Sequence, residues 1–216
     1  MLRTGTVSDS TAGLSALHLL SHGVRAFKVV AMLPQGLVHL VSDAHCVGAD
    51  CGEIVTTFEN RLVRDQNAVY ISCRNGTNVN DAIERVPAGT VRKVYHGCEW
   101  IWTNSTGYVL PPGQAVMVTN GLEPNASTSI SGSDIRQSDS EQGLGIKNRN
   151  PLFSLAVSHT LEGADDATSC VVAPGVALAD MPAIADVRNN VTVAQNSAGL
   201  QAVWDAEQGY LVAGKN

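Results

Sequence analysis

The sequence predicts an all-β protein, a large antiparallel β-sandwich with at most one short helix near the N-terminus. Composition supports this fold class, because charged residues make up only 16% of the 216 residues and the chain has 20 glycines. Such a composition favours many short strands joined by turns. The hydrophobic fraction of 44% is enough to build a core. The order of β-branched runs and turn residues along the chain points the same way.

The first three strand-like runs set the pattern. Val24–Leu33 is β-branched and apolar, and Pro34–Gly36 has the composition of a turn. Leu37–Val41 follows, and residues 42–52 form a stretch of small residues that we expect to be a loop. Glu53–Val63 then alternates polar and apolar positions. Three such runs in succession are typical of an antiparallel sheet.

The remaining strands follow the same rules to the end of the chain. They are expected at Ala68–Cys73, Val91–Tyr95, Glu99–Thr103, Tyr108–Leu110, Ala115–Thr119, Leu152–Ser158, Ser169–Ala173, Val191–Gln195, Gln201–Asp205 and Gly209–Val212. Residues 120–150 are rich in Ser, Asp, Gly and Asn and are expected to be loop, with room for a short strand over 127–130. Thr11–His22 is the only segment with a weak helical pattern. We expect one sandwich domain over residues 1–216.

Charge and hydropathy exclude several classes of function. The formal net charge is −6 and no Lys/Arg cluster reverses it locally, which argues against a nucleic-acid surface. No apolar run approaches the roughly 20 residues that a membrane-spanning helix needs. The first residues lack the apolar core of a signal peptide. Tight binding of a polyanionic glycan would need a local basic groove.

The cysteines and the motif search predict no metal and no cofactor. Five cysteines leave at least one unpaired; Cys46 and Cys51 flank a short loop and could be bridged, but buried thiols are the favoured interpretation. A zinc site from His45, Cys46 and Cys51 lacks a second ligand pair at finger spacing. The chain also lacks a Gly-x-Ser-x-Gly elbow, a Walker loop and a dinucleotide fingerprint.

The order of several segments resembles the central β-sandwich of polysaccharide lyase family 8, which includes hyaluronate, chondroitin AC and xanthan lyases. The likeness runs from about Val7 to Leu211. It rests on Phe27–Lys28, Leu37–Ser42, Thr56–Arg61, Trp100–Trp102 followed by Gly107–Pro111, Phe153–His159, Val171–Pro174, Val193–Asn196 and Leu200–Val203. This resemblance implies a galactose mutarotase-like super-sandwich.

The resemblance implies a function in eliminative cleavage of uronic-acid-containing polysaccharide. In the family, the catalytic Asn, His, Tyr and Arg lie on an α-helical toroid that precedes the sandwich, and the few residues before the first matched strand are too few for it. We therefore carry over no catalytic residue and expect this chain to form one wall of the substrate cleft. The alternative is a free-standing, non-catalytic sandwich that binds carbohydrate or another partner. Whether the chain alone acts as an enzyme stays open.

Four residues are the candidates for carbohydrate contact. Asn60 and Arg61 follow the Thr-Thr pair, and the alternative for Arg61 is an ordinary salt bridge or cover for an apolar edge. Trp100 and Trp102 share a strand face by period two, and each could stack on a sugar ring or belong to the core. Tyr108 and His159 are interpreted as structural, hydrogen-bonded residues.

The resemblance also implies location and partners. Lyases of this type are exported, so we expect this chain to belong to a longer extracellular or periplasmic protein. Its partners would be a uronate-containing polysaccharide, including glycosaminoglycans, and the missing α-helical toroid, with no nucleic acid and no membrane. The smaller C-terminal sandwich of the family would also lie outside these residues.

Overall fold

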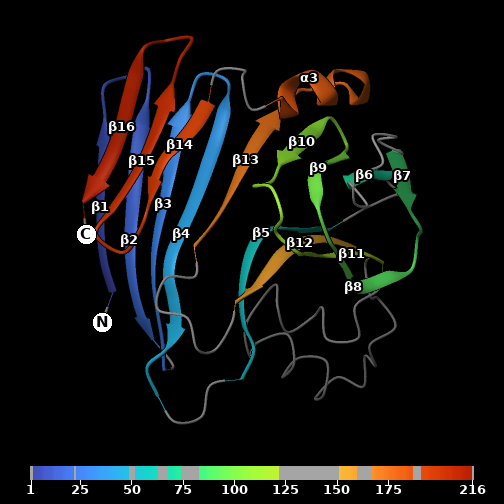
Figure 1. Ribbon diagram of the computed structural model, residues 1–216, viewed down its shortest axis with the longest axis horizontal. Helices are drawn as coiled ribbons and strands as arrows, with labels where there is room; N and C mark the ends of the chain where they lie inside the picture. The colour runs from blue at the N-terminus through green and yellow to red at the C-terminus, as the bar shows by residue number, and fades with distance from the viewer. Residues whose placement is uncertain are drawn as a thin grey trace, which may run out of the picture.

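A computed structural model describes residues 2–21, 23–48, 52–62, 68–73, 83–121, 151–159, 167–186 and 191–215. Within these ranges the chain is almost entirely β-structure, arranged in three antiparallel sheets of nine, four and three strands (Figure 1). The prediction of an all-β sandwich is confirmed. None of the helices in the described part of the chain is long and apolar enough to cross a membrane.

The nine-stranded sheet is the largest of the three, and its strands lie in the order β1-β2-β3-β4-β13-β10-β9-β6-β7. Its strands are β1 (Leu2–Ser8), β2 (Gly13–Ser21), β3 (Val24–Leu33), β4 (Gly36–Cys46), β6 (Val69–Cys73), β7 (Ile83–Val86), β9 (Cys98–Thr103), β10 (Thr106–Val109) and β13 (Thr168–Pro174). Because β13 pairs with β4 on one side and β10 on the other, it joins the two halves of the sheet.

The four-stranded sheet covers one face of the second half of the nine-stranded sheet, the half that runs from β13 to β7. Its strands, in the order β5-β12-β11-β8, are β5 (Ile54–Leu62), β12 (Leu152–His159), β11 (Val116–Gly121) and β8 (Thr90–Tyr95). Phe153 and Leu155 from this sheet pack with Ile101 and Tyr108 from the nine-stranded sheet in the larger core. We call this side of the nine-stranded sheet the inner face.

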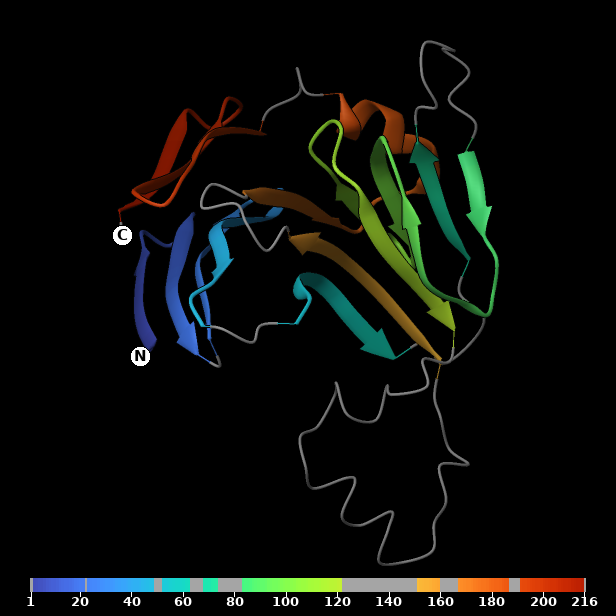
Figure 2. The ribbon, with the colours of Figure 1, turned by 60° about the horizontal axis from the view of Figure 1, so that its bottom comes forward.

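The three-stranded sheet covers the opposite, outer face of the first half of the nine-stranded sheet, which runs from β1 to β4 (Figure 2). Its strands are β14 (Val191–Asn196), β15 (Leu200–Asp205) and β16 (Tyr210–Lys215). Val203 packs with Val29 and Leu40 in a second core. The Asn196 side chain donates to the carbonyls of Val41 and Thr168, at 3.2 and 2.9 Å, which anchors this sheet across the β4–β13 pair.

The short 3-10 helix η1 (Leu178–Asp180) leads into the helix α3 (Met181–Ala185), which lies against the outer face of β9 and β10. Met181 is fully buried there. It packs directly on Gly107, where any Cβ would overlap the Met181 sulfur. A glycine on β10 is therefore what allows the helix to sit on the sheet.

Three local expectations were wrong. Residues 13–21, expected as the only helix, form β2, which pairs along its length with both β1 and β3, so tertiary pairing overrides a weak helical pattern. The expected loop over 42–52 begins later, because β4 continues to Cys46. Strands β1 and β7 and helix α3 were not expected, since they are short or polar segments. The strand expected over 127–130 lies outside the described residues.

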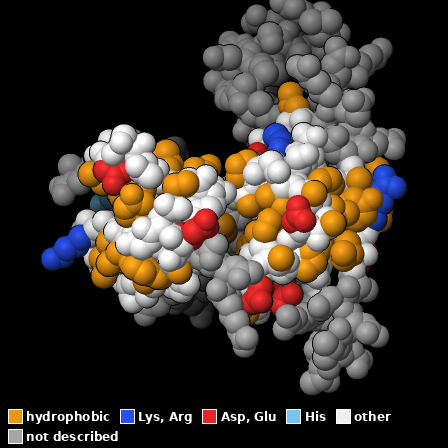
Figure 3. All heavy atoms as spheres, turned by 90° about the horizontal axis from the view of Figure 1, so that it is seen from above, with side chains coloured by type: hydrophobic (Ala, Val, Ile, Leu, Met, Phe, Trp, Pro, Cys, Tyr) orange, Lys and Arg blue, Asp and Glu red, His pale blue; other side chains and the backbone are white. Residues whose placement is uncertain are grey.

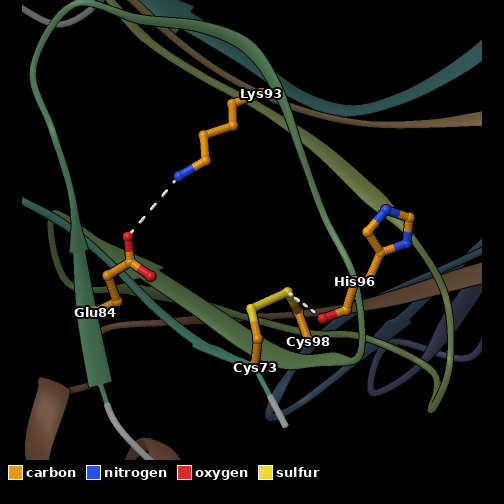
Figure 4. Close-up of a disulfide and its surroundings, with 5 residues drawn as sticks. All are labelled: Cys73, Glu84, Lys93, His96 and Cys98. Carbon is orange, nitrogen blue, oxygen red and sulfur yellow. Dashed lines mark hydrogen bonds and ion pairs between the residues drawn. A yellow bond between two sulfur atoms is a disulfide. The ribbon is translucent and has the colours of Figure 1, made fainter. Parts of the chain in front are cut away.

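The preference for buried thiols was also wrong for most of the described cysteines. Cys73 of β6 and Cys98 of β9 form a disulfide between paired strands (Figure 4). Cys46 is disulfide-bonded as well, while Cys51, suggested as its partner, lies outside the described residues. Cys170 alone among the described cysteines is free, and it is buried. Pairing of β6 with β9 brings together two cysteines that are 25 residues apart in sequence.

Candidate carbohydrate-contact site

Strand β5 presents the polar residues that follow the Thr-Thr pair, and a β-bulge decides where they point. Thr57 pairs with Ala156 and Glu59 with Leu155, so Phe58 is the extra residue on β5. A bulge re-aims the side chains after it. As a result, Glu59 and Arg61 reach partners on the nine-stranded sheet, whereas Asn60 between them is exposed.

Glu59 binds a fully buried tyrosine across the sandwich. The Tyr108 hydroxyl donates to Glu59 Oε2 at 2.7 Å, and Tyr108 is 0% exposed. Burial, followed by the hydrogen bond and charge of Glu59, raises the pKa of Tyr108 far above its usual value. Tyr108 therefore stays a neutral donor that fixes the Glu59 carboxylate, which confirms its structural interpretation.

Arg61 is held by the sandwich itself. Its Nη2 donates to the Thr103 carbonyl at 3.2 Å, and its guanidinium carbon lies 5.6 Å from the centroid of the Phe153 ring. This contact with an aromatic face is a cation–π interaction. The side chain is half-buried, so its position is set before any ligand arrives.

Lys28 and His39 lie on the inner face of β3 and β4 beside β5. Lys28 pairs with Val41 and His39 with Val30, which places both side chains on one face of the hairpin. The His39 ring meets the Phe58 ring edge-on at 6.2 Å. Burial lowers the pKa of Lys28. Burial and, secondarily, the Lys28 charge lower the pKa of His39, while Glu59 acts in the opposite direction.

Together Lys28, His39, Glu59, Arg61 and Tyr108 form what we call the inner-face cluster. It carries two cations and one carboxylate within a protein of net charge −6, so it is locally basic. No ion pair is found for Lys28 among the described residues. A half-buried ammonium without a carboxylate partner is poorly solvated and gains from binding an anion. The charge of the cluster therefore suits an anionic group.

Trp100 and Trp102 lie on the other side of the nine-stranded sheet. Ile101 between them belongs to the inner-face core, so the two indoles project from the outer face. Trp100 is only 2% exposed, and the Trp102 N–H donates to the Val176 carbonyl at 2.8 Å. The structure therefore does not bring the four candidate residues to one place. For both indoles it shows packing roles, and sugar contact stays a prediction that burial disfavours for Trp100.

His159 is structural, as interpreted from the sequence. Its Nε2 lies 2.7 Å from Thr56 Oγ1, and the residue is 4% exposed. Both groups sit on the paired strands β5 and β12. Within the described ranges, no group of three or more His, Cys, Asp or Glu side chains could hold a metal ion.

An apolar cleft of about 650 Å³ opens on the outer face between α3 and β14, with β13 as its floor. Its walls include Leu33, Val109, Val171, Ile184 and Val193. Figure 3 looks down on this end of the molecule and shows hydrophobic side chains on both sides of the furrow. The cleft contains none of the four candidate residues, and nothing in the sequence pointed to it.

A family model described as polysaccharide lyase family 8, super-sandwich domain, matches residues 3–185. The chain belongs to polysaccharide lyase family 8. The match covers the four-stranded sheet, the nine-stranded sheet and α3, and it ends just before β14. The suspected family relationship is confirmed. No curated protein matches the chain by sequence.

Solved structures of chondroitin AC lyases and of a xanthan lyase share the fold at low sequence identity. A chondroitinase AC lyase is 16% identical to this chain, with a TM-score of 0.69. The matched region covers 97% of this chain and 28% of the chondroitinase chain. A Paenibacillus xanthan lyase is 18% identical, with a TM-score of 0.72, and the match covers 98% of this chain and 20% of the xanthan lyase chain. A Streptomyces coelicolor chondroitin AC lyase in complex with chondroitin sulphate is 19% identical, with a TM-score of 0.60. That match covers 98% of this chain and 24% of the Streptomyces chain. This family 8 chain thus spans between a fifth and somewhat over a quarter of the length of these proteins.

Sequence reasoning overlooked two members of the inner-face cluster in this family 8 domain. Nothing in the sequence singles out His39, and Lys28 stands only within the Phe27–Lys28 segment of the family resemblance. Each is a polar residue within a largely apolar strand, and the pairing of β3 with β4 puts both side chains on the same face of the hairpin. That signal shows which face they share, but the contact with β5 depends on the packing of two sheets.

Proposed function

We propose that this chain is the sandwich portion of a polysaccharide lyase that cleaves uronic-acid-containing polysaccharide by β-elimination. The family model over residues 3–185 carries this proposal. In the proposed whole protein, an α-helical toroid outside these 216 residues supplies the catalytic groups. The low coverage of the matched solved structures supports such a missing part.

Beta-elimination sets a clear task for the wall of a substrate cleft. The sugar carboxylate must be neutralised so that the proton on the adjacent carbon can be removed by a base, while an acid protonates the leaving oxygen. In our proposal Arg61 and Lys28 orient or neutralise a uronate near β5, and exposed Asn60 adds a neutral hydrogen bond. None of these residues removes the proton.

The cysteine chemistry supports an exported protein. Cys73 and Cys98 form a disulfide and Cys46 is disulfide-bonded. Disulfides persist mainly in extracellular and periplasmic compartments and are rare in reducing cytosol. We therefore propose an extracellular or periplasmic location, in keeping with a polymeric substrate that cannot enter the cell.

The decisive test begins with sequencing the source locus upstream of Met1 and expressing the complete protein found there. Hyaluronan, chondroitin and xanthan are then offered separately, and the ultraviolet absorbance of the unsaturated uronate product is followed. We expect the complete protein to produce this absorbance with at least one polymer and the 216-residue chain to produce none. Arg61→Gln in the complete protein should lower kcat/KM by about tenfold or more, as expected for loss of a charged contact.

A matched variant and two outcomes make the test sharp. Arg92→Gln removes an equal charge at an exposed pair with Glu53 on the four-stranded sheet, and we expect kcat/KM to stay unchanged. A complete protein that binds these polymers without cleaving them would contradict the lyase proposal and favour the non-catalytic binding sandwich. Cleavage by the 216-residue chain alone would contradict the assignment of catalysis to a toroid.

A further inference from the structure

The outward face of the three-stranded sheet carries an exposed tryptophan. Val203, Val193 and Val212 point toward β3 and β4, so the alternate residues point to solvent. On β15 this places Trp204 on the outward side, where it is 40% exposed. Its direct neighbours are Thr192 on β14 and Leu211 on β16, and Leu211 is 61% exposed. A flat apolar platform flanked by a hydroxyl results.

This face differs in charge from the rest of the protein. Its exposed residues on the three strands are Thr192, Ala194, Gln195, Leu200, Trp204, Leu211, Ala213 and Lys215. Lys215 is the only charged side chain among these residues, although the whole chain has a net charge of −6. An acid-free surface with one exposed cation is complementary to an anionic ligand.

The spacing along β16 suits an extended ligand. Leu211 lies opposite Trp204, and Lys215 lies four residues further along the same strand face. At about 3.3 Å per residue the separation is roughly 13 Å. A sugar ring stacked on Trp204 and an acidic sugar further along one glycan chain could therefore contact the indole and the ammonium together.

We propose that the outward face of β14–β16, from Trp204 to Lys215, is a second carbohydrate-binding surface for uronate-containing polysaccharide. The apolar face of one sugar stacks on the indole, Thr192 and Gln195 offer hydrogen bonds, and Lys215 pairs with a uronate carboxylate. The surface lies on the opposite side of the nine-stranded sheet from the inner-face cluster. The choice of uronate as ligand rests on the proposed function.

The test uses nuclear magnetic resonance of the 216-residue chain with labelled tryptophan. A hyaluronan oligosaccharide is the probe, and a neutral cello-oligosaccharide of equal length is the comparison. We expect the indole N–H signal of Trp204, assigned with Trp204→Phe, to shift with hyaluronan while that of buried Trp100 stays in place. Lys215→Gln should raise the Kd about fivefold or more, and added salt should weaken wild-type binding.

Matched variants separate specific from general effects. Lys93→Gln removes an equal charge from an exposed lysine on β8, and we expect its Kd to equal that of wild type. Trp204→Ala should abolish binding, and Trp204→Phe should restore part of it. Equal affinity for the neutral oligosaccharide, or no Trp204 shift at millimolar ligand, would overturn the proposal.

The complete protein distinguishes this inference from the proposed function. If the complete protein cleaves a uronate polymer but its Trp204 signal does not respond, the surface proposal alone fails. If Trp204 responds to hyaluronan in a complete protein that has no lyase activity, the surface proposal stands and the proposed function fails.

Discussion

At the scale of single residues, the inner-face cluster shows how a protein of negative net charge can present a basic site. Lys28 and His39 are half-buried, and burial lowers the pKa of both. Glu59 is engaged by the Tyr108 hydroxyl, which is too strongly buried to ionise. The Glu59 carboxylate thus already accepts a hydrogen bond from Tyr108, so an external anion can compete with it for Lys28 and Arg61.

His39 makes the stability of the protein depend on pH. Because burial holds its folded-state pKa below the usual value of about 6.5, the unfolded chain binds the proton more readily. Stability is complete above about pH 6.5 and falls as the pH drops toward the lowered pKa. We expect His39→Gln to reduce the loss of unfolding free energy between about pH 7 and about pH 5, measured by urea unfolding.

An exposed histidine provides the control for this pH dependence. His96→Gln makes the same chemical change at an exposed position in the turn between β8 and β9, so it shows how much of any effect comes from the substitution itself. A profile that is the same in wild type and His39→Gln would contradict the role of burial at this position.

At the scale of elements, single positions decide how strands and helices meet. The bulge at Phe58 on β5 turns Glu59 and Arg61 toward the nine-stranded sheet, and Gly107 on β10 lets Met181 of α3 settle on the sheet. Both features are departures from regular strands, and both position a neighbouring element.

Gly107→Ala tests the contact between β10 and α3. The added methyl would overlap the Met181 side chain, which is fully buried and has little room to move. We expect the free energy of unfolding to fall by about 1–3 kcal/mol, as for other overpacked sites. The Gly107→Ala, Met181→Ala double variant should lose less unfolding free energy than the two single losses added together, because Met181→Ala removes the side chain that the new methyl would overlap.

Gly199→Ala is the matched control for this substitution. No atom outside the neighbouring residues lies within 4 Å of the added methyl at Gly199. Its unfolding free energy should therefore stay within about 0.5 kcal/mol of wild type. Equal losses for Gly107→Ala and Gly199→Ala would show that the helix does not pack as described.

At the scale of the whole molecule, one large sheet is covered on opposite faces at its two ends. The four-stranded sheet lies on the inner face of the β13–β7 half, and the three-stranded sheet lies on the outer face of the β1–β4 half. This offset leaves the apolar cleft between α3 and β14 on the outer face and the inner-face cluster beside β5. The cleft and the inner-face cluster thus lie on opposite sides of one sheet.

The Cys73–Cys98 disulfide contributes to the stability of the whole fold. It closes a segment of 25 residues in the unfolded chain, and such cross-links typically contribute about 2–4 kcal/mol. We expect a Cys73→Ala, Cys98→Ala double variant to lose roughly this amount in urea unfolding under oxidising conditions. Cys170→Ala, which removes a buried free thiol, should lose less. A smaller loss for the double variant than for Cys170→Ala would contradict a stabilising disulfide.

The sequence by itself determined the fold class, most strand positions and the family. Period-two alternation, β-branched runs and turn residues are local properties, and they predicted strands such as Leu152–Ser158 within a residue or two of β12. The same local reasoning failed at residues 13–21, where pairing with β1 and β3 decides the structure.

Only the tertiary structure decided which residues meet. Arg61 and Trp102, grouped as contact candidates, lie on opposite sides of the nine-stranded sheet, whereas Lys28, His39 and Glu59 come together from three strands. Parity along a strand assigns a side chain to a face, but packing of sheets on that face depends on contacts between residues far apart in sequence. The Cys73–Cys98 bond and the exposure of Trp204 follow from the same long-range packing.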